Sequence, residues 1–209
     1  MMAKVDCAPK TINLRDLCLE FSGENSTCPQ ILAVVGPMAA GKNFICSQLE
    51  QQGWASVDAD ILVHEAIEIA HDRILNTFTE YADTKGLKLE RPDGTIDRRA
   101  LGHLLFAIPE LLTVQESIVY PIITQKITEF IASHDKTIIN ATVLYKTPAL
   151  LAVCDKILFV TAPLLTRIHR ARNRDQLPYK QIFRRFWAQR NLLDEYKKTG
   201  KPLEIINNR

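Results

Sequence analysis

A short segment early in the chain carries residue types that bind phosphate. Gly36 and the pair Gly41-Lys42 fit the spacing G-x-x-x-x-G-K, and they follow an apolar run at residues 31–35. A turn of this kind between a strand and a helix directs several backbone N–H groups at one anion, and the helix N-terminus adds partial positive charge. Lys42 would place an ammonium group on the terminal phosphates. Asn43 stands where a serine or threonine helps to hold Mg²⁺.

The spacing by itself would also fit an ordinary glycine-containing turn. The apolar run before it and the helix expected at residues 44–52 favour the phosphate-binding interpretation. We therefore expect one loop to bind the phosphates of a nucleotide, formed by Gly36, Pro37, Met38, Ala39, Ala40, Gly41, Lys42 and Asn43.

Two carboxylates follow the next apolar segment. Residues 54–57 read as a strand, and Asp58 and Asp60 come directly after it, at the end where parallel sheets bind ligands. Strand alternation would place both carboxylates on the same side. Taken alone they would fit a helix N-cap and a solvated turn. Beside a phosphate loop, a carboxylate has two uses: to orient and deprotonate an attacking hydroxyl, or to hold Mg²⁺ through water.

The segment from Arg167 to Arg190 is basic, with eight Lys or Arg residues and one acid, Asp175. It would fit a nucleic-acid surface, a charged helix face, or a lid whose arginines close over phosphates. Phosphoryl transfer needs cations that neutralise charge on the transferring group, so the lid is favoured. Arg170 and Arg174 are the candidate lid cations.

Apolar strands alternate with helical segments through most of the chain. Strands are expected at 31–35, 54–57, 136–141 and 156–161, with 205–206 closing the sheet, and helices at 44–52, 61–81, 97–106, from 109, 121–133, from 163 and from 178. Asp97 is the expected N-cap of its helix. The alternation predicts an α/β fold, with a parallel sheet flanked by helices and a helical insert between the second and third strands.

Composition is that of a globular protein: of 209 residues, 46% are hydrophobic and 24% charged. A net charge of +2 predicts neither nucleic-acid nor membrane binding, and no apolar run approaches a membrane span. No apolar stretch follows the first lysines, so we expect no secretory signal. The five cysteines have unrelated spacings, which favours reduced thiols in a cytoplasmic protein, with Cys46 and Cys154 in the core.

Several further motifs occur in one order along the chain. Asp58-Ala59-Asp60 is followed by the segment D-G-T-I-D-R-R-A-L at 93–101, Tyr120-Pro121, Arg170-x-x-x-Arg174-Asp175 and Asn207-Asn208. With the phosphate loop, these motifs make the chain from residue 31 onward resemble the dephospho-coenzyme A kinases, which are similar to nucleoside monophosphate kinases and have the P-loop NTPase fold. Residues 1–29 lie outside the resemblance, as an N-terminal extension.

The resemblance implies an enzyme that transfers the γ-phosphate of ATP to the ribose 3′-hydroxyl of dephospho-CoA, the last step of coenzyme A synthesis, with Mg²⁺. It implies a nucleotide-binding core at 30–61 and 135–209, with a lid at about 170–190, and a helical insert at 62–134 that receives dephospho-CoA. No nucleic-acid or membrane partner is expected, and the protein would be a monomer or a weak homo-oligomer.

The same resemblance assigns roles to individual residues. Asp60 matches the catalytic aspartate that activates the hydroxyl, and Lys42, Arg170 and Arg174 match the other catalytic positions. Asn43 matches a Mg²⁺ position, and Asp58, as one of the two carboxylates that follow the second strand, is the other candidate Mg²⁺ ligand. Arg98 and Tyr120 lie in the region that receives the substrate, and Asn208 lies where the family closes over the adenine end of ATP.

Four positions depart from the family pattern. Asn43 replaces Ser or Thr, Tyr120 replaces His, and Asn140 and Lys146 replace acidic residues. These departures leave three functions open: an active dephospho-CoA kinase, a kinase of another small hydroxyl compound, and a nucleotide-binding module without turnover. A nucleic-acid-binding protein is a more distant alternative.

Overall fold

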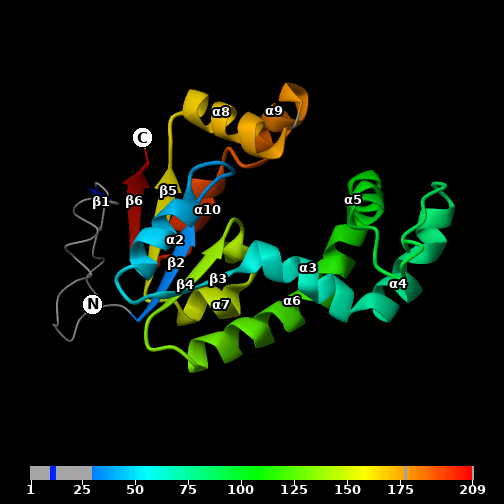
Figure 1. Ribbon diagram of the computed structural model, residues 1–209, viewed down its shortest axis with the longest axis horizontal. Coiled ribbons are helices and arrows are strands. Elements are labelled where there is room, and N and C mark those ends of the chain that lie inside the picture. Colours follow the sequence, from blue (N-terminus) through cyan, green and yellow to red (C-terminus); the bar gives the residue numbers. More distant parts are fainter. Residues whose placement is uncertain (1–9, 13–29, 177, 209) are drawn as a thin grey trace, which may run out of the picture. The chain divides into compact units, whose positions relative to one another are not determined.

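The computed structural model describes residues 10–12, 30–176 and 178–208 of the chain. Within this part, six strands form one sheet in the order β1-β6-β5-β2-β4-β3, and every pair of neighbours is parallel (Figure 1). The strands are β1 (Lys10–Ile12), β2 (Ile31–Val35), β3 (Ala55–Asp58), β4 (Thr137–Ala141), β5 (Lys156–Thr161) and β6 (Leu203–Asn207). The α/β prediction with a parallel sheet is confirmed.

The described residues group into two compact units. One comprises those up to Asp58 together with those from Glu129 onward, and the other is Ala59–Thr128. The first contains the sheet and the helices α2 (Lys42–Glu50), η1 (Leu144–Lys146), α7 (Pro148–Val153), α8 (Leu164–Asp175), α9 (Tyr179–Ala188) and α10 (Leu192–Lys197). The second contains α3 (Ala59–Ile69), α4 (His71–Asp83), α5 (Arg98–Ala107) and most of α6 (Glu110–Ala132).

Strand alternation sorts the core of the first unit onto the two faces of the sheet. Leu158 and Val160 of β5 join a buried cluster with Ile45 of α2, whereas Phe159 contacts Tyr196 of α10 edge to face. Helices α2 and α10 therefore cover opposite faces (Figure 1). β2, buried along nearly its whole length, lies between β4 and β5 and ends at the phosphate loop.

The N-terminal extension predicted at residues 1–29 supplies an edge strand. Lys10–Ile12 forms β1, which pairs with β6 at the edge of the sheet. The rest of that extension, with Cys7, Cys18 and Cys28, lies outside the described residues. Cys46 and Cys154 are buried, as predicted, and burial raises the pKa of each thiol to about 12.

Two helix predictions in the second unit are wrong. The helix expected at 61–81 is two helices, because the backbone of Ala70 leaves helical geometry at φ −90° and ψ 17°. The helices expected from 109 and from 121 are one helix, α6, with Pro121 inside it. Proline removes one helical hydrogen bond, but buried side chains on both sides of it, Ile118 and Ile123, keep the helix packed through that position.

Asp97 is the N-cap of α5, as predicted. Its carboxylate accepts hydrogen bonds from the backbone N–H groups of Ala100 and Arg99, which hold the pKa of Asp97 below its usual value. No helix among the described residues combines the length and the apolar character needed to cross a membrane.

The hydroxyl of Tyr196 fixes the loop that follows β4. It accepts a hydrogen bond from the backbone N–H of Leu144 at 2.8 Å and donates one to the carbonyl of Thr142 at 3.1 Å. The ring is fully buried. The turn after β4 is thereby attached to α10.

Replacing Tyr196 with Phe should lower the free energy of unfolding by about 2 kcal/mol, because it leaves the buried N–H of Leu144 and the partly buried carbonyl of Thr142 without that hydroxyl. Urea denaturation measures the change. The matched control is Tyr145→Phe, whose ring lies beside Tyr196 and is only half-buried; it should change stability by about 0.5 kcal/mol or less. Equal effects of the two substitutions would contradict the role of the Tyr196 hydroxyl.

Candidate functional site

Residues 36–41 form a loop from the end of β2 to the start of α2, and two glycines are required in it. Gly36 has φ +147°, and a Cβ there would collide with the carbonyl oxygen of Val160. Gly41 has φ +96°, and a Cβ there would collide with the side-chain amide of Asn208. Ala39 also has a positive φ, of 61°, so the loop contains a left-handed residue that is not glycine.

The loop leads into a helix N-terminus suited to an anion. Gly41 is the N-cap of α2 and supplies no side-chain hydrogen bond, and no acidic residue lies in the first turn. The first N–H groups of an α-helix have no acceptor within the helix, and the helix dipole favours negative charge there. The start of α2 can therefore receive a phosphate group.

Two residues from far along the chain bind the carbonyl of Ala40. Asn208, after β6, donates from Nδ2 at 3.0 Å, and Arg170 of α8 donates from Nη1 at 3.3 Å. Arg170 also donates to the carbonyl of Asn208 at 3.5 Å. This cluster fixes the turn immediately before Lys42.

Met38 attaches the loop to α8 and α9. Its N–H donates to Oε1 of Gln189 at 2.7 Å, and its carbonyl accepts from Nε of Arg167 at 3.0 Å. Its side chain packs in a buried cluster with Ile182 and Phe186. The guanidinium of Arg167 lies 4.2 Å from the centroid of the Phe186 ring, and burial lowers the pKa of Arg167.

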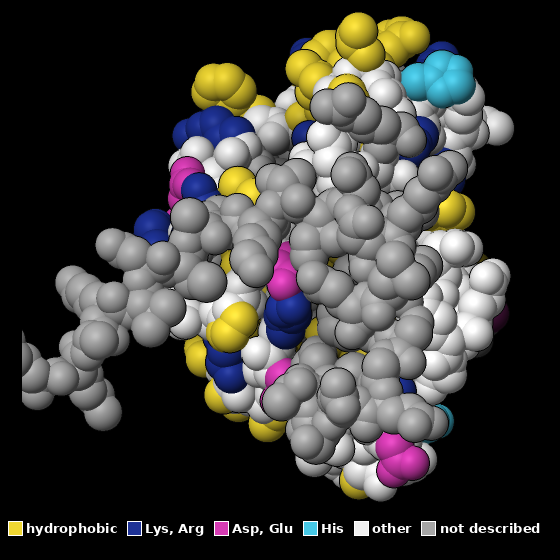
Figure 2. Space-filling view, turned by 90° about the vertical axis from the view of Figure 1, so that its left-hand side faces the viewer, with side chains coloured by type: hydrophobic (Ala, Val, Ile, Leu, Met, Phe, Trp, Pro, Cys, Tyr) yellow, Lys and Arg dark blue, Asp and Glu magenta, His cyan; other side chains and the backbone are white. Residues whose placement is uncertain are grey.

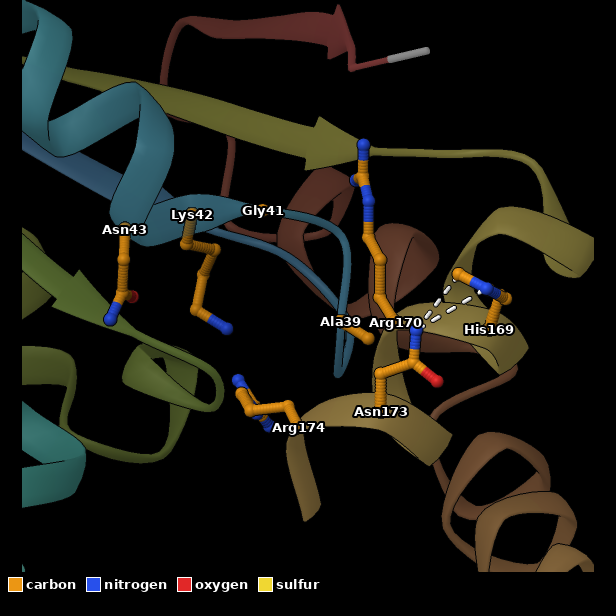
Figure 3. A pocket seen from close by; sticks show the side chains of 8 residues that line it. All are labelled: Ala39, Gly41, Lys42, Asn43, His169, Arg170, Asn173 and Arg174. Atoms are coloured by element: carbon orange, nitrogen blue, oxygen red, sulfur yellow. Dashed lines mark hydrogen bonds between the residues drawn. The ribbon is translucent and has the colours of Figure 1, made fainter. Parts of the chain in front are cut away.

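A cavity of about 670 Å³ lies between the loop and α8, which is large enough for a nucleotide. Its lining residues are Ala39, Gly41, Lys42, Asn43, His169, Arg170, Asn173 and Arg174. In Figure 3 the side chains of Lys42 and Arg174 extend toward the same open space, whereas that of Arg170 extends away from it. Lys42 Nζ donates to the carbonyl of Gly36 at 3.2 Å and to Oγ1 of Thr142 at 3.1 Å.

Three polar side chains from different elements meet near the carboxyl ends of β4 and the edge strand β3. Asn140 of β4 is 4% exposed, and its Nδ2 donates to Oδ1 of Asn43 at 2.9 Å and to Oδ2 of Asp58 at 3.0 Å. Parallel register places Asp58 opposite Asn140 on the neighbouring strand. Oδ1 of Asn140 is buried, and no described residue donates a hydrogen bond to it.

The structure places the predicted site residues in both units. The loop with Lys42 and Asn43, then Asp58, Arg170, Arg174 and Asn208, all belong to the first unit. Asp60, Arg98 and Tyr120 belong to the second, in α3, α5 and α6. The prediction that strand alternation places Asp58 and Asp60 on the same side is wrong, because β3 ends at Asp58 and Asp60 lies in the first turn of α3.

The sequence did not predict the contacts of four residues that organise the site: Asn140 as a hydrogen-bond donor, Thr142, Arg167 and Gln189. The strand-end rule that selected Asp58 would also have selected Asn140 and Thr142, because β4 ends at Ala141. Nothing local in the sequence indicates that Arg167 and Gln189 bind the backbone of Met38.

The basic segment does not form a purely cationic surface. Arg167 and Arg170 donate to carbonyls of the loop, which leaves fewer cations for a nucleic acid. Figure 2 shows the described Lys and Arg side chains of one face interspersed with Asp and Glu, and hydrophobic side chains gathered at the top, where α8 and α9 lie. Exposed apolar residues of these two helices include Leu165, Phe183 and Trp187.

Comparisons with known proteins agree on one family. A family model described as dephospho-CoA kinase matches residues 30–208. A Treponema pallidum protein named dephospho-CoA kinase is 36% identical over 168 residues, covering 78% of this chain and 79% of its own length. A Treponema denticola protein of the same name is 34% identical over 186 residues, covering 86% of this chain and 82% of its own length.

Solved structures show the same fold. TT1252 from Thermus thermophilus aligns with a TM-score of 0.69 at 24% identity, over 87% of this chain and 89% of its own. The dephospho-CoA kinase from Campylobacter jejuni aligns with a TM-score of 0.55 at 23% identity, over 86% of this chain and 88% of its own.

Replacing Met38 with Ala should lower the free energy of unfolding by about 2 kcal/mol or more, because it opens a cavity in the cluster that joins the loop to α8 and α9. ATP affinity should fall in parallel, since the loop loses that anchor. Chemical denaturation and calorimetric titration measure the two effects. Met38→Leu, which nearly conserves volume, is the control, and a loss of ATP affinity as large as that of the alanine variant would argue against the anchor.

Proposed function

The chain belongs to the dephospho-CoA kinase family, and on that premise we propose that it transfers the γ-phosphate of ATP to the ribose 3′-hydroxyl of dephospho-CoA, giving CoA and ADP. The observation that carries the proposal is the cavity in which Lys42 and Arg174 extend toward one space beside the N-terminus of α2. Such an arrangement suits the triphosphate of a nucleotide, because it combines backbone N–H donors with two cations.

The cations have different roles in this proposal. Lys42 contacts the terminal phosphates and neutralises charge that develops during transfer, and Arg174, exposed at the cavity, closes on the transferring phosphoryl group. Arg170 fixes the conformation of the turn before Lys42 by donating a hydrogen bond to the carbonyl of Ala40. Asn208 does the same from the other end of the chain and lies toward the adenine side.

The residues near Asn43 fit Mg²⁺. Asp58, Asn43 and Asn140 offer carboxylate and amide oxygens, and Oδ1 of Asn140 is a buried oxygen to which no described residue donates. The described residues include no cluster of three or more His, Cys, Asp or Glu side chains that could hold a metal. Mg²⁺ is commonly bound by one or two carboxylates plus substrate phosphates and water, so Asn43 and Asp58 would hold it with the nucleotide. When bound, it would neutralise charge on the phosphates.

The acceptor side of the proposal involves the second unit. Asp60, exposed in the first turn of α3, orients the 3′-hydroxyl and accepts its proton as the bond to phosphorus forms. Arg98, the first residue of α5, and Tyr120 of α6 bind dephospho-CoA. Arg98 is exposed and thus accessible to a phosphorylated ligand.

A nucleotide-binding module without turnover is the second candidate. It is favoured by Asn43 and Asn140, which replace a hydroxyl and a carboxylate next to the Mg²⁺ position, and by Lys146 in η1, which replaces an acid. That candidate predicts ATP binding without product from any acceptor. A kinase of another small hydroxyl compound predicts product from a different member of an acceptor panel.

The purified protein with ATP, Mg²⁺ and dephospho-CoA should release ADP and form CoA, identified by mass. Lys42→Met should reduce the rate by about 100-fold or more, because the transferring phosphoryl group loses its cation. Lys85→Met, which removes an exposed cation after α4, is the matched control and should leave the rate unchanged. ATP binding without CoA formation would reject the proposal. Product from another member of the acceptor panel would then indicate a kinase of another hydroxyl compound, and no product from any acceptor would indicate the second candidate.

Asp60→Asn should lower turnover by about 10²–10⁴-fold and leave ATP affinity nearly unchanged, because the amide cannot accept the hydroxyl proton. Single-turnover kinetics and calorimetry with ATP separate the two quantities. Asp83→Asn, an exposed carboxylate at the end of α4, controls for the loss of one negative charge. Unchanged turnover in Asp60→Asn would remove this residue from the mechanism.

A further inference from the structure

Asn140 uses both hydrogens of its side-chain amide to join two elements of the nucleotide site. One goes to Oδ1 of Asn43 at the start of α2 and the other to Oδ2 of Asp58 at the end of β3, at 2.9 and 3.0 Å. Asn140 itself is 4% exposed, so water does not readily replace either bond. The side chain thus acts as a double donor between two oxygen acceptors.

We propose that Asn140 is a positioning residue for the nucleotide-bound cation, and that Asn43 and Asn140 form a matched amide pair that cannot be exchanged one member at a time. The inference rests on the proposed function, in which Asn43 and Asp58 face Mg²⁺. It goes beyond that function because it assigns a role to Asn140 and makes the two departures from the family pattern depend on each other.

Residues 43 and 140 depend on each other because the side-chain amide of Asn140 donates hydrogen bonds that a carboxylate cannot donate. A carboxylate at position 140 has no hydrogen to donate, and it would lie about 3 Å from the carboxylate of Asp58. Turning the Asn43 amide would supply a donor for one contact, but the two carboxylates would still repel each other. A carboxylate at position 140 therefore needs a cation close by, whereas the amide does not.

The same pairing changes how the cation is held. With an amide at 140, Asp58 is the one carboxylate in the cluster of three, and Lys42 lies next to Asn43 in the chain. One negative charge with a cation nearby gives little attraction for Mg²⁺ alone. Mg²⁺ should consequently bind together with the nucleotide, whose phosphates supply the missing charge.

The test compares the wild-type protein with Asn140→Asp, Asn43→Thr and the double variant that carries both changes. Thermal unfolding is followed with a chelator and with Mg²⁺ alone, and calorimetry gives the affinity for a Mg²⁺-bound, non-hydrolysable ATP analogue. Asn76→Asp, at an exposed position of α4, adds the same charge away from the site and serves as the control.

In chelator, Asn140→Asp should unfold at a lower temperature than the wild type, and adding Mg²⁺ alone should raise its unfolding temperature to the wild-type value. The unfolding temperatures of the wild type and of Asn76→Asp should not change with Mg²⁺ alone. Each single variant should bind the Mg²⁺ analogue about tenfold more weakly, as is usual when a side chain that supports a metal ligand is changed. The double variant should recover most of that lost affinity. In Asn43→Thr alone the threonine oxygen accepts from the Asn140 amide, whereas in the double variant the hydroxyl donates to the new carboxylate and keeps its lone pairs for the cation.

Additive losses of analogue affinity in the double variant would overturn the matched pair. An Asn140→Asp protein whose unfolding temperature does not change with Mg²⁺ in the absence of nucleotide would overturn it as well. If Asn140→Asp does not fold, Asn43→Thr still tests the proposal, because Asn43 is exposed and its replacement does not change the buried core. Analogue binding by Asn43→Thr equal to the wild type would reject the proposal. None of these measurements uses dephospho-CoA, so a failed acceptor assignment and a failed amide pair give different results.

Discussion

The backbone of the phosphate loop is held in place by side chains from the last quarter of the chain. Arg170 and Asn208 donate to the carbonyl of Ala40, and Arg167 and Gln189 bind the backbone of Met38. A loop with a left-handed alanine and two glycines at positive φ has little preference of its own for one conformation. These long-range bonds select that conformation, and everything placed by the loop, including the lysine and the start of α2, depends on them.

The same bonds divide the basic residues into two functional classes. Arginines that donate to the loop, such as Arg167 and Arg170, are partly buried and fixed by protein acceptors. Arg174, one turn beyond Arg170 on α8, is exposed at the cavity. Lys42 shares features of both classes, since its side chain extends toward the cavity and also donates hydrogen bonds to the carbonyl of Gly36 and the hydroxyl of Thr142. A phosphate that enters must compete with those two acceptors, which keep the lysine extended until then.

Features encoded over a few neighbouring residues were predictable from the sequence. β2, the glycine turn and the Asp97 cap depend on local chemistry, so their patterns are visible in the chain. Pro121 inside α6 was not predictable, because burial of distant side chains outweighs the lost hydrogen bond there. The contacts of Asn140 were also hidden, since they join residues 82 and 97 positions apart. The residue types of a site can thus be read locally, whereas the bonds that orient them require the packed fold.

The two tryptophans of the chain occupy contrasting surroundings. Trp54 is 4% exposed within the core cluster that joins α2 to the sheet, whereas Trp187 on α9 is 70% exposed, with the guanidinium of Arg190 4.6 Å from its ring. Their emission therefore separates into a shielded, short-wavelength component and a long-wavelength component open to soluble quenchers. Rearrangement of α9 alters the second without the first. The protein thus carries an intrinsic optical signal for the helix next to its phosphate loop, distinct from the signal of its core.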